Sequence, residues 1–200
     1  SNPGKILALL LSIPGVLIAI TFHEYAHAWT AYKLGDDTAK SQGRLSLNPL
    51  KHMDPIGIVM LLFLGFGWGR PVEIDSRNFN RNISVRKAEA IVSIAGPLAN
   101  FILAIVFSAI YGALIKFNAL TSMDTRTALT IITILQSIIS INIGLGVFNL
   151  IPLPPLDGSK VLSYFLPYNA RNWFENNQQI FYIIFLIIWI TGIAGTIISP

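Results

Sequence analysis

The stretch from Ile6 to Gly35 has the sequence ILALLLSIPGVLIAITFHEYAHAWTAYKLG and decides the fold of this 200-residue chain. Its first 17 residues carry no charge. A helix over the whole stretch would be roughly 44 Å long at about 1.5 Å per residue, which exceeds a bilayer hydrocarbon core of about 30 Å. The ionisable residues His23, Glu24 and His27 follow the uncharged run. We therefore predict a first membrane-spanning helix, residues 5–34, that carries these three side chains in its second half.

The composition extends the membrane prediction to the rest of the chain. Hydrophobic residues make up 53% and charged residues only 12%, against about 25% charged in ordinary soluble domains. The apolar segment 55–69 is marginal in length for a regular span, so we favour a short or re-entrant segment over a full span there. The predicted fold class is an all-α polytopic membrane protein with about four to six membrane segments and a small membrane-associated β element. One domain, residues 1–200, is expected to hold spans at about 5–34, 88–115, 128–150 and 180–198.

The basic residues are distributed unevenly along the chain. Nine of the fourteen Lys and Arg residues lie between Lys33 and Lys87. Cytoplasmic loops carry an excess of Lys and Arg, so we expect this region, and the end of the first helix that bears His23, to face the cytoplasm. The loop that contains Asp157 follows the third span and returns to the same side. Because the basic residues lie between apolar spans, nucleic acid is not an expected partner.

His23 and His27 have the spacing of a metal-binding pair. On a helix, residues four positions apart lie on one face about one turn apart, so both imidazoles can bind one zinc ion. Glu24 lies between them, where it can deprotonate a water on the metal rather than bind the metal itself. Ionisable groups at membrane depth cost several kcal/mol unless they are paired or liganded. The motif therefore indicates a metal-dependent hydrolytic centre rather than a chance match.

The third metal ligand has two candidates. Zinc in a hydrolase typically has three protein ligands and one open position. His52 is the only other histidine, and Asp157 follows the Pro-rich stretch 152–155, where broken backbone at membrane depth is tolerated around a cavity. Asp-Gly is also a common turn pair, but beside the two histidines we favour Asp157 as the ligand. For His52, an active-site role and a loop-ordering role both stay open. Asp54 before Pro55 is interpreted as a helix cap.

Two further patterns concern the surroundings of this centre. Asn100 and Asn149 are amides inside apolar spans, which can donate to an oxyanion or cross-link helices. Two short stretches alternate polar and apolar residues as strands do. We hypothesise that they form a sheet edge, which holds an unwound substrate segment by strand addition. The residues of this hypothetical edge are Arg44, Leu45, Ser46, Leu47, Val72, Glu73, Ile74 and Asp75.

Three motifs in order resemble the site-2 protease family of intramembrane zinc metalloproteases. The first is His-Glu-Tyr-Ala-His at 23–27, and the last is NLIPLPPLDG at 149–158. Between them, AGPLAN at 95–100 is similar to the Gly-Pro-x-x-Asn element of the family. Residues 48–57 and 66–72 look like the compact subgroup that lacks appended PDZ and nucleotide-sensing domains. The family often has two glycines after the aspartate, whereas this chain has Gly-Ser, and the regulation that appended domains provide stays open.

The resemblance implies one zinc ion per chain, bound by His23, His27 and Asp157, with Glu24 as the catalytic base. It implies that both candidate asparagines lie near the site. The implied substrate is a transmembrane protein, cleaved in or near its membrane segment within the lipid bilayer of a prokaryotic cell, in regulated intramembrane proteolysis. Two alternatives are a metal transporter, which needs ligands stepping across the membrane, and a catalytically silent scaffold, which does not need Glu24. The oligomeric state is not encoded in these motifs.

Overall fold

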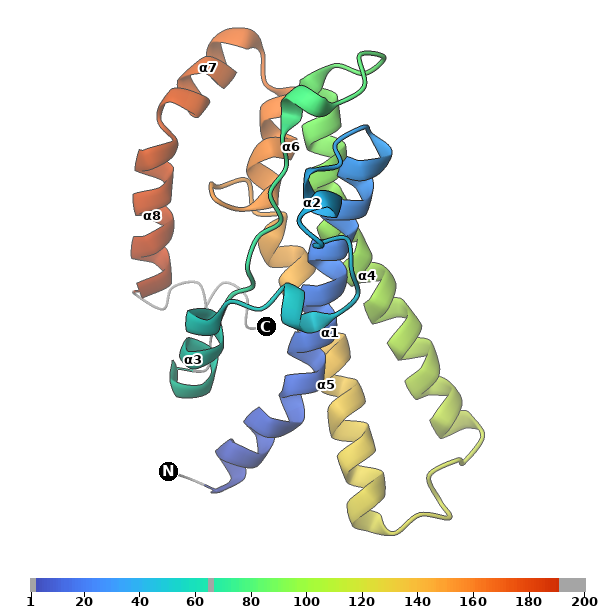
Figure 1. The fold of residues 1–200 in the computed structure, drawn as a ribbon. Coiled ribbons are helices and arrows are strands. Elements are labelled where there is room, and N and C mark those ends of the chain that lie inside the picture. Colours follow the sequence, from blue (N-terminus) through green and yellow to red (C-terminus); the bar gives the residue numbers. More distant parts are fainter. Residues whose placement is uncertain (1–2, 65–66, 191–200) are drawn as a thin grey trace.

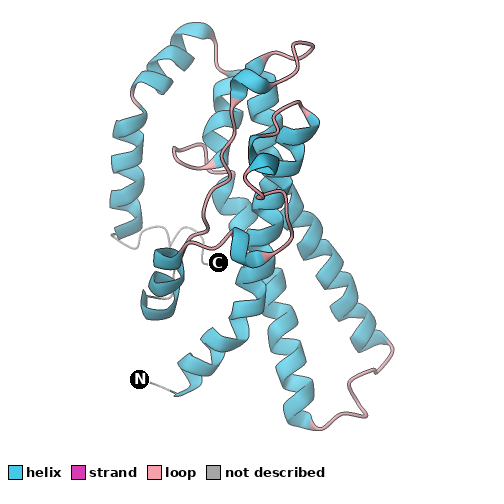
Figure 2. Ribbon diagram, in the orientation of Figure 1, coloured by secondary structure: helices cyan, strands magenta, loops and turns pink. Residues whose placement is uncertain are grey.

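The computed structural model describes residues 3–64 and 67–190, and all regular elements in these ranges are helices (Figures 1 and 2). The long helices are α1 (Pro3–Lys33), α4 (Val85–Lys116) and α5 (Thr125–Asn149). The shorter elements are α2 (Thr38–Ser41), η1 (Pro49–Lys51), α3 (Pro55–Leu64), η2 (Ser76–Asn78), α6 (Asp157–Phe165), α7 (Tyr168–Asn176) and α8 (Gln178–Ile190). The predicted all-helical class is confirmed over these residues.

The three long helices form a bundle that exposes apolar side chains. Each is long and apolar enough to cross a membrane, and in each helix at most 33% of an apolar stretch of 18 residues is buried inside the protein. α1, α4 and α5 contact one another pairwise and lie side by side in Figure 1. They match the spans expected at 5–34, 88–115 and 128–150. Apolar surface of this extent is stable in lipid rather than in water.

The remaining predicted membrane segments fall on shorter helices. The described residues contain three helices of spanning length, and the expected total of about four to six membrane segments also included shorter ones. α8 begins two residues before the span predicted at 180–198, and the end of that prediction lies outside the described residues. α3 has 10 residues and is roughly 15 Å long at about 1.5 Å per residue, too short for a regular span. The segment from 55 therefore begins with a short helix, and a short or re-entrant membrane segment at 55–69 stays a prediction.

The two strands expected at 44–47 and 72–75 are not present in the part of the chain that the structure describes (Figure 2). The only backbone pairing of the β type within those residues is a single antiparallel bridge between Met53 and Gly69. A strand pair needs two backbones that exchange hydrogen bonds in register. Here the Val72 and Asp75 N–H groups donate to the side chains of Glu24 and Asp36, so the alternating pattern marks extended chain and not a sheet.

α1 ends where the sequence indicated a stop. Its last residue is Lys33, and Gly35 has φ +107°, a conformation that glycine adopts without steric cost. Beyond this turn, Phe79 packs into a small core with Ala31 of α1 and with Ala88 and Val92 of α4. This core joins the second half of α1 to the first half of α4.

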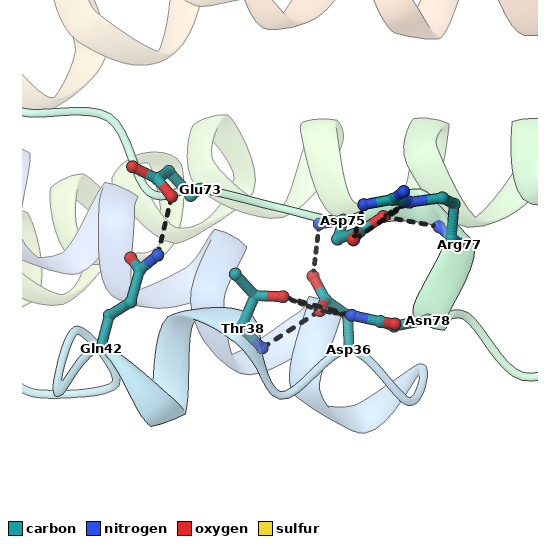
Figure 3. A network of polar contacts seen from close by, with 7 residues as sticks. All are labelled: Asp36, Thr38, Gln42, Glu73, Asp75, Arg77 and Asn78. Carbon is teal, nitrogen blue, oxygen red and sulfur yellow. Dashed lines mark hydrogen bonds and ion pairs between the residues drawn. The ribbon is translucent and has the colours of Figure 1, made fainter.

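A buried carboxylate fastens the loop before α4 to the end of α1 (Figure 3). Asp36 is fully buried. It accepts hydrogen bonds from the Thr38 backbone N (3.1 Å) and Oγ1 (2.5 Å), from Asn78 Nδ2 (3.0 Å) and from the Asp75 backbone N (2.8 Å). Burial alone raises the pKa of Asp36, but these hydrogen bonds, led by that from Thr38, outweigh it and hold the pKa below its usual value.

Candidate metal centre

Three of the side chains singled out from the sequence converge on one point. His23 and His27 come from α1, and Asp157 is the first residue of α6. The His23 and His27 Nε2 atoms are 3.0 Å apart, and each lies 3.2 Å from Asp157 Oδ2. Both histidines are buried, with 6% and 7% of their surface exposed. Within the described residues this is the only group of three such side chains close enough to hold a metal ion.

The hydrogen bonds of the two imidazoles define which nitrogen faces the centre. His23 Nδ1 lies 2.7 Å from Asn100 Oδ1, and His27 Nδ1 lies 2.7 Å from the Val92 carbonyl oxygen. Carbonyl oxygens only accept hydrogen bonds, so in both rings Nδ1 carries the proton and donates it. The neutral rings then direct the lone pairs of their Nε2 atoms at each other and at Asp157. This is the orientation of metal-bound histidines, whose second nitrogen is held by a carbonyl or carboxylate.

The convergent atoms fit a bound cation. Two imidazole lone pairs and one carboxylate oxygen lie about one hydrogen-bond length apart, yet none of them has a proton to donate to the others. Asp157 Oδ2 is buried and has no hydrogen-bond donor among the described residues. A buried, unpaired carboxylate oxygen is costly unless a proton or a metal ion neutralises it. Two nitrogens and one oxygen are the ligand set of catalytic zinc.

A second layer of buried amides supports His23. Asn100 Nδ2 donates to the Ala19 carbonyl oxygen (3.0 Å) and to Asn142 Oδ1 (2.9 Å), and Asn142 Nδ2 donates to the Ile138 carbonyl oxygen (2.8 Å). Both asparagine side chains are fully buried. The network therefore connects α1, α4 and α5 and sets the rotation of the His23 ring. Asn100 therefore lies directly against His23, one of the three side chains of the group.

Gly96 lets α4 approach the histidine rings. A Cβ atom on Gly96 would lie 2.6 Å from His27 Cε1 and 2.7 Å from His23 Cε1, closer than non-bonded carbon atoms approach each other. No larger residue fits there unless the rings move. Gly96 of the AGPLAN segment thus lies directly against the two histidine rings.

Glu24 lines a large cavity next to the three-ligand group. Its Oε2 accepts a hydrogen bond from the backbone N–H of Val72 (2.8 Å). Glu24 and His23 line a cavity of about 800 Å³ together with Asn149 of α5. Asn149 Nδ2 donates to the Leu145 carbonyl oxygen of its own helix (3.0 Å). The other lining residues are mostly apolar: Ile20, Met60, Gly67, Trp68, Gly69, Pro71, Leu145, Phe148, Pro155, Leu156, Tyr182, Phe185 and Leu186.

The remaining predicted residues lie in the loops around this cavity. His52 is fully buried and does not belong to the metal group; its Nε2 donates to the Ser46 carbonyl oxygen (2.7 Å). Asp54 Oδ1 accepts from the backbone N–H groups of Ile56 (2.8 Å) and Gly57 (2.9 Å), which confirms the predicted cap of α3. Of the residues proposed as a sheet edge, Arg44 is buried and Leu47 is exposed, whereas Leu45, Ser46, Val72, Ile74 and Asp75 are half-buried and Glu73 is exposed.

Sequence reasoning missed two contributors to the site. Asn142 was visible only as one of several polar residues in an apolar span, and its position behind Asn100 depends on how α5 packs. The Val92 carbonyl that holds His27 is a backbone group, so no residue type marks it. A buried amide in a membrane helix is the one signal that could have identified Asn142.

These features define a class of protein: a helical membrane hydrolase with a His-His-Asp metal group beside a glutamate. Residues 11–192 match Peptidase family M50, the site-2 protease family, and the chain belongs to that family. It is accordingly a metalloendopeptidase, and its apolar helices and family make it an integral membrane protein.

The chain is also similar to bacterial proteins of the same kind. It is 38% identical over 191 residues to the "Putative zinc metalloprotease YwhC" of Bacillus subtilis, a match that covers 92% of this chain and 82% of that protein. It is 29% identical over 185 residues to the "Putative zinc metalloprotease Rip2" of Mycolicibacterium smegmatis, covering 91% and 67%. The Rip2 protein of Mycobacterium tuberculosis H37Rv is 27% identical over 190 residues, covering 90% and 66%. No solved structure matches the chain.

Proposed function

We propose that the protein is an intramembrane protease, which uses one zinc ion per chain to hydrolyse a peptide bond in or near the transmembrane segment of a membrane protein. The observation that carries this proposal is the convergence of His23 Nε2, His27 Nε2 and the unpaired Asp157 Oδ2, at a cavity that His23 and Glu24 line together. The zinc metalloprotease relatives support the identity of the metal. Cleavage of this type is the central step of regulated intramembrane proteolysis.

The chemistry divides between the metal and the protein side chains. Zinc bound by His23, His27 and Asp157 would supply Lewis acidity, which polarises a carbonyl and lowers the pKa of a water. Glu24 accepts the proton from the attacking water and then passes it to the leaving amine, as a general base and acid. Asn149 lines the same cavity and donates to the developing oxyanion. No covalent acyl-enzyme forms, because the nucleophile is water.

The extended chain at 72–75 is the proposed binding edge for substrate. A transmembrane helix has all its backbone groups paired, so the substrate must unwind before its peptide bond can be reached. Within the described residues, the backbone N–H groups of Glu73 and Ile74 have no hydrogen-bond partner. These groups can pair with an unwound segment by strand addition without belonging to a sheet beforehand. Residues 44–47 contribute through Arg44, which donates to the carbonyl oxygens of Arg70 and Pro71, directly before this extended chain.

The proposed location is a prokaryotic cell membrane, with the active site toward the cytoplasm. Support comes from the nine basic residues between Lys33 and Lys87 and from the bacterial relatives. A metal transporter is disfavoured because the described residues contain one metal-binding group and no series of them. A silent scaffold is disfavoured because Glu24 is intact in the cavity beside the metal group.

A cleavage assay with a single-span model substrate tests the proposal. Purified protein in lipid vesicles is expected to cleave the substrate, to stop when a chelator removes the metal, and to recover when zinc returns. The Asp157→Ala variant is expected to bind little zinc and to be inactive. Cleavage that persists in chelator, or zinc binding that survives the loss of Asp157, would contradict the proposal.

A further inference from the structure

Arg44 is a buried cation without a carboxylate partner. Its side chain has only 5% of its surface exposed, and it forms no ion pair within residues 3–64 and 67–190. Its guanidinium donates instead to two consecutive backbone carbonyls, from Nη2 to Arg70 O (2.6 Å) and from Nη1 to Pro71 O (3.4 Å). Burying a charge against carbonyls alone costs free energy, so we expect a functional role of Arg44 that explains its position.

The peptide group that Arg44 binds is also the one that contacts Glu24. The Pro71 carbonyl and the Val72 N–H belong to one planar peptide unit, in which the oxygen and the hydrogen point in opposite directions. Arg44 binds the oxygen side, and the N–H side donates to Glu24 Oε2 (2.8 Å). The peptide unit thus lies between a cation and an anion, and each hydrogen bond polarises the peptide and strengthens the other.

The electrostatics agree with this arrangement. Burial lowers the pKa of Arg44, and the Glu24 carboxylate is the main charge that opposes the effect. The guanidinium nevertheless stays charged at any ordinary pH. The two side chains form no direct ion pair within the described residues, and the contact that joins them runs through the Pro71–Val72 peptide.

We propose that Arg44 is a positioning residue for the reaction: through the Pro71–Val72 peptide it fixes the orientation of the Glu24 carboxylate. The inference rests on the proposed role of Glu24 as general base. A base that is held in one orientation needs no reorganisation when it accepts the proton from water. The opposite reading, in which residues 70–72 block Glu24, predicts the opposite sign: weakening the Arg44 contact would then raise the rate.

Other contacts hold the same chain without reaching Glu24. Gln42 Nε2 donates to Glu73 Oε2 (2.7 Å) at an exposed position, one residue beyond Val72 (Figure 3). This contact joins the same two loops as the Arg44 contact but involves side chains only. Gln42→Ala is therefore the matched control, because it removes a link between the loops and leaves the Pro71–Val72 peptide untouched.

The test measures kcat, KM and zinc content in lipid vesicles for the wild type, Arg44→Gln, Arg44→Lys, Gln42→Ala and Glu24→Gln. Since a positioned base contributes roughly 10²- to 10⁴-fold to rate, Arg44→Gln is expected to lower kcat by at least about tenfold. Zinc is expected to stay bound, because Arg44 is not one of the three metal-binding side chains. The decisive readout is kcat at saturating substrate, since a change in KM alone would report only on the proposed binding edge at 72–75. Arg44→Lys keeps the charge but not the two-carbonyl geometry, so it should recover part of the lost kcat. Gln42→Ala should behave as the wild type.

Each other outcome overturns the inference in a recognisable way. An unchanged or raised kcat in Arg44→Gln contradicts it, and so does a loss of zinc in parallel with activity. If Arg44→Gln does not fold, Val72→Pro removes the donor itself; compared with Val72→Ala, which keeps the N–H, it must lower kcat further. If the wild type cleaves, Glu24→Gln does not, and the Arg44 variants keep the wild-type kcat, only this inference is refuted. A wild type that does not cleave refutes the proposed function as well.

Discussion

Replacing Asn100 with alanine should weaken zinc binding without touching a metal ligand. The substitution removes the acceptor for His23 Nδ1, a 2.7 Å hydrogen bond between buried groups. Loss of such a partner typically lowers metal affinity by 10- to 100-fold, or about 1.4–2.8 kcal/mol at 1.4 kcal/mol per tenfold. Because Asn100 is fully buried, bulk water cannot easily replace the lost oxygen, and we expect a value in the upper half of this range.

The same substitution also affects folding, so affinity must be measured on the folded fraction. Asn142 Oδ1 loses its donor from Asn100, and a buried acceptor left unpaired costs about 1–3 kcal/mol. Competition with a chromophoric zinc chelator in detergent micelles gives the affinity, and a thermal melt of the same sample gives the stability. Gln136→Ala is the control, since it removes a side-chain amide of α5 whose hydrogen bond to Tyr111 is exposed. Zinc affinity in Asn100→Ala equal to that of the control would refute this account of the second layer.

Two further predictions concern Gly96 and Asp36. Gly96→Ala places a Cβ 2.6 Å from His27 Cε1, so we expect displaced imidazole rings and zinc binding weaker by at least about tenfold, as when a supporting group is lost. Wild-type affinity in the same chelator competition would contradict this prediction and show that α4 can move to accommodate the added methyl group. For Asp36 the folded-state pKa is lowered, so its ionised form contributes stability above the ordinary Asp pKa of about 3.9, and this contribution is lost as the pH falls through the lowered pKa. Asp36→Asn should therefore lower Tm most near pH 7, with the difference from the wild type shrinking toward pH 3. A difference in Tm that does not vary with pH would contradict the role of the charge.

Local features of the metal site could be predicted from the sequence because they depend on one helix. The spacing of His23 and His27 fixes their common face wherever the helix lies. Asp157 is about 130 residues away in the sequence, and it was identified from the broken backbone around it and from the family resemblance. Asn142 could not be assigned to the site, because its contact with Asn100 depends on the relative rotation of α4 and α5.

The predicted strands show where a periodic pattern is insufficient. Alternation at 72–75 correctly marks extended backbone, but a pattern of side chains does not say what the backbone groups bind. The Val72 N–H donates to Glu24 and the Asp75 N–H donates to Asp36, so side chains of α1 and of the turn that follows it replace a neighbouring strand. Such contacts join positions 39 and 48 residues apart, and only the packed fold reveals them.

The most direct test of the central claim is to measure zinc content and cleavage on one preparation of Glu24→Gln. If His23, His27 and Asp157 bind the metal and Glu24 moves the proton, the variant binds one zinc ion per chain, as the wild type does, and cleaves no substrate. The glutamine keeps an oxygen that can accept from Val72, so the fold around it should be preserved. Cleavage near the wild-type rate, or a variant that folds but binds no zinc, would contradict the account.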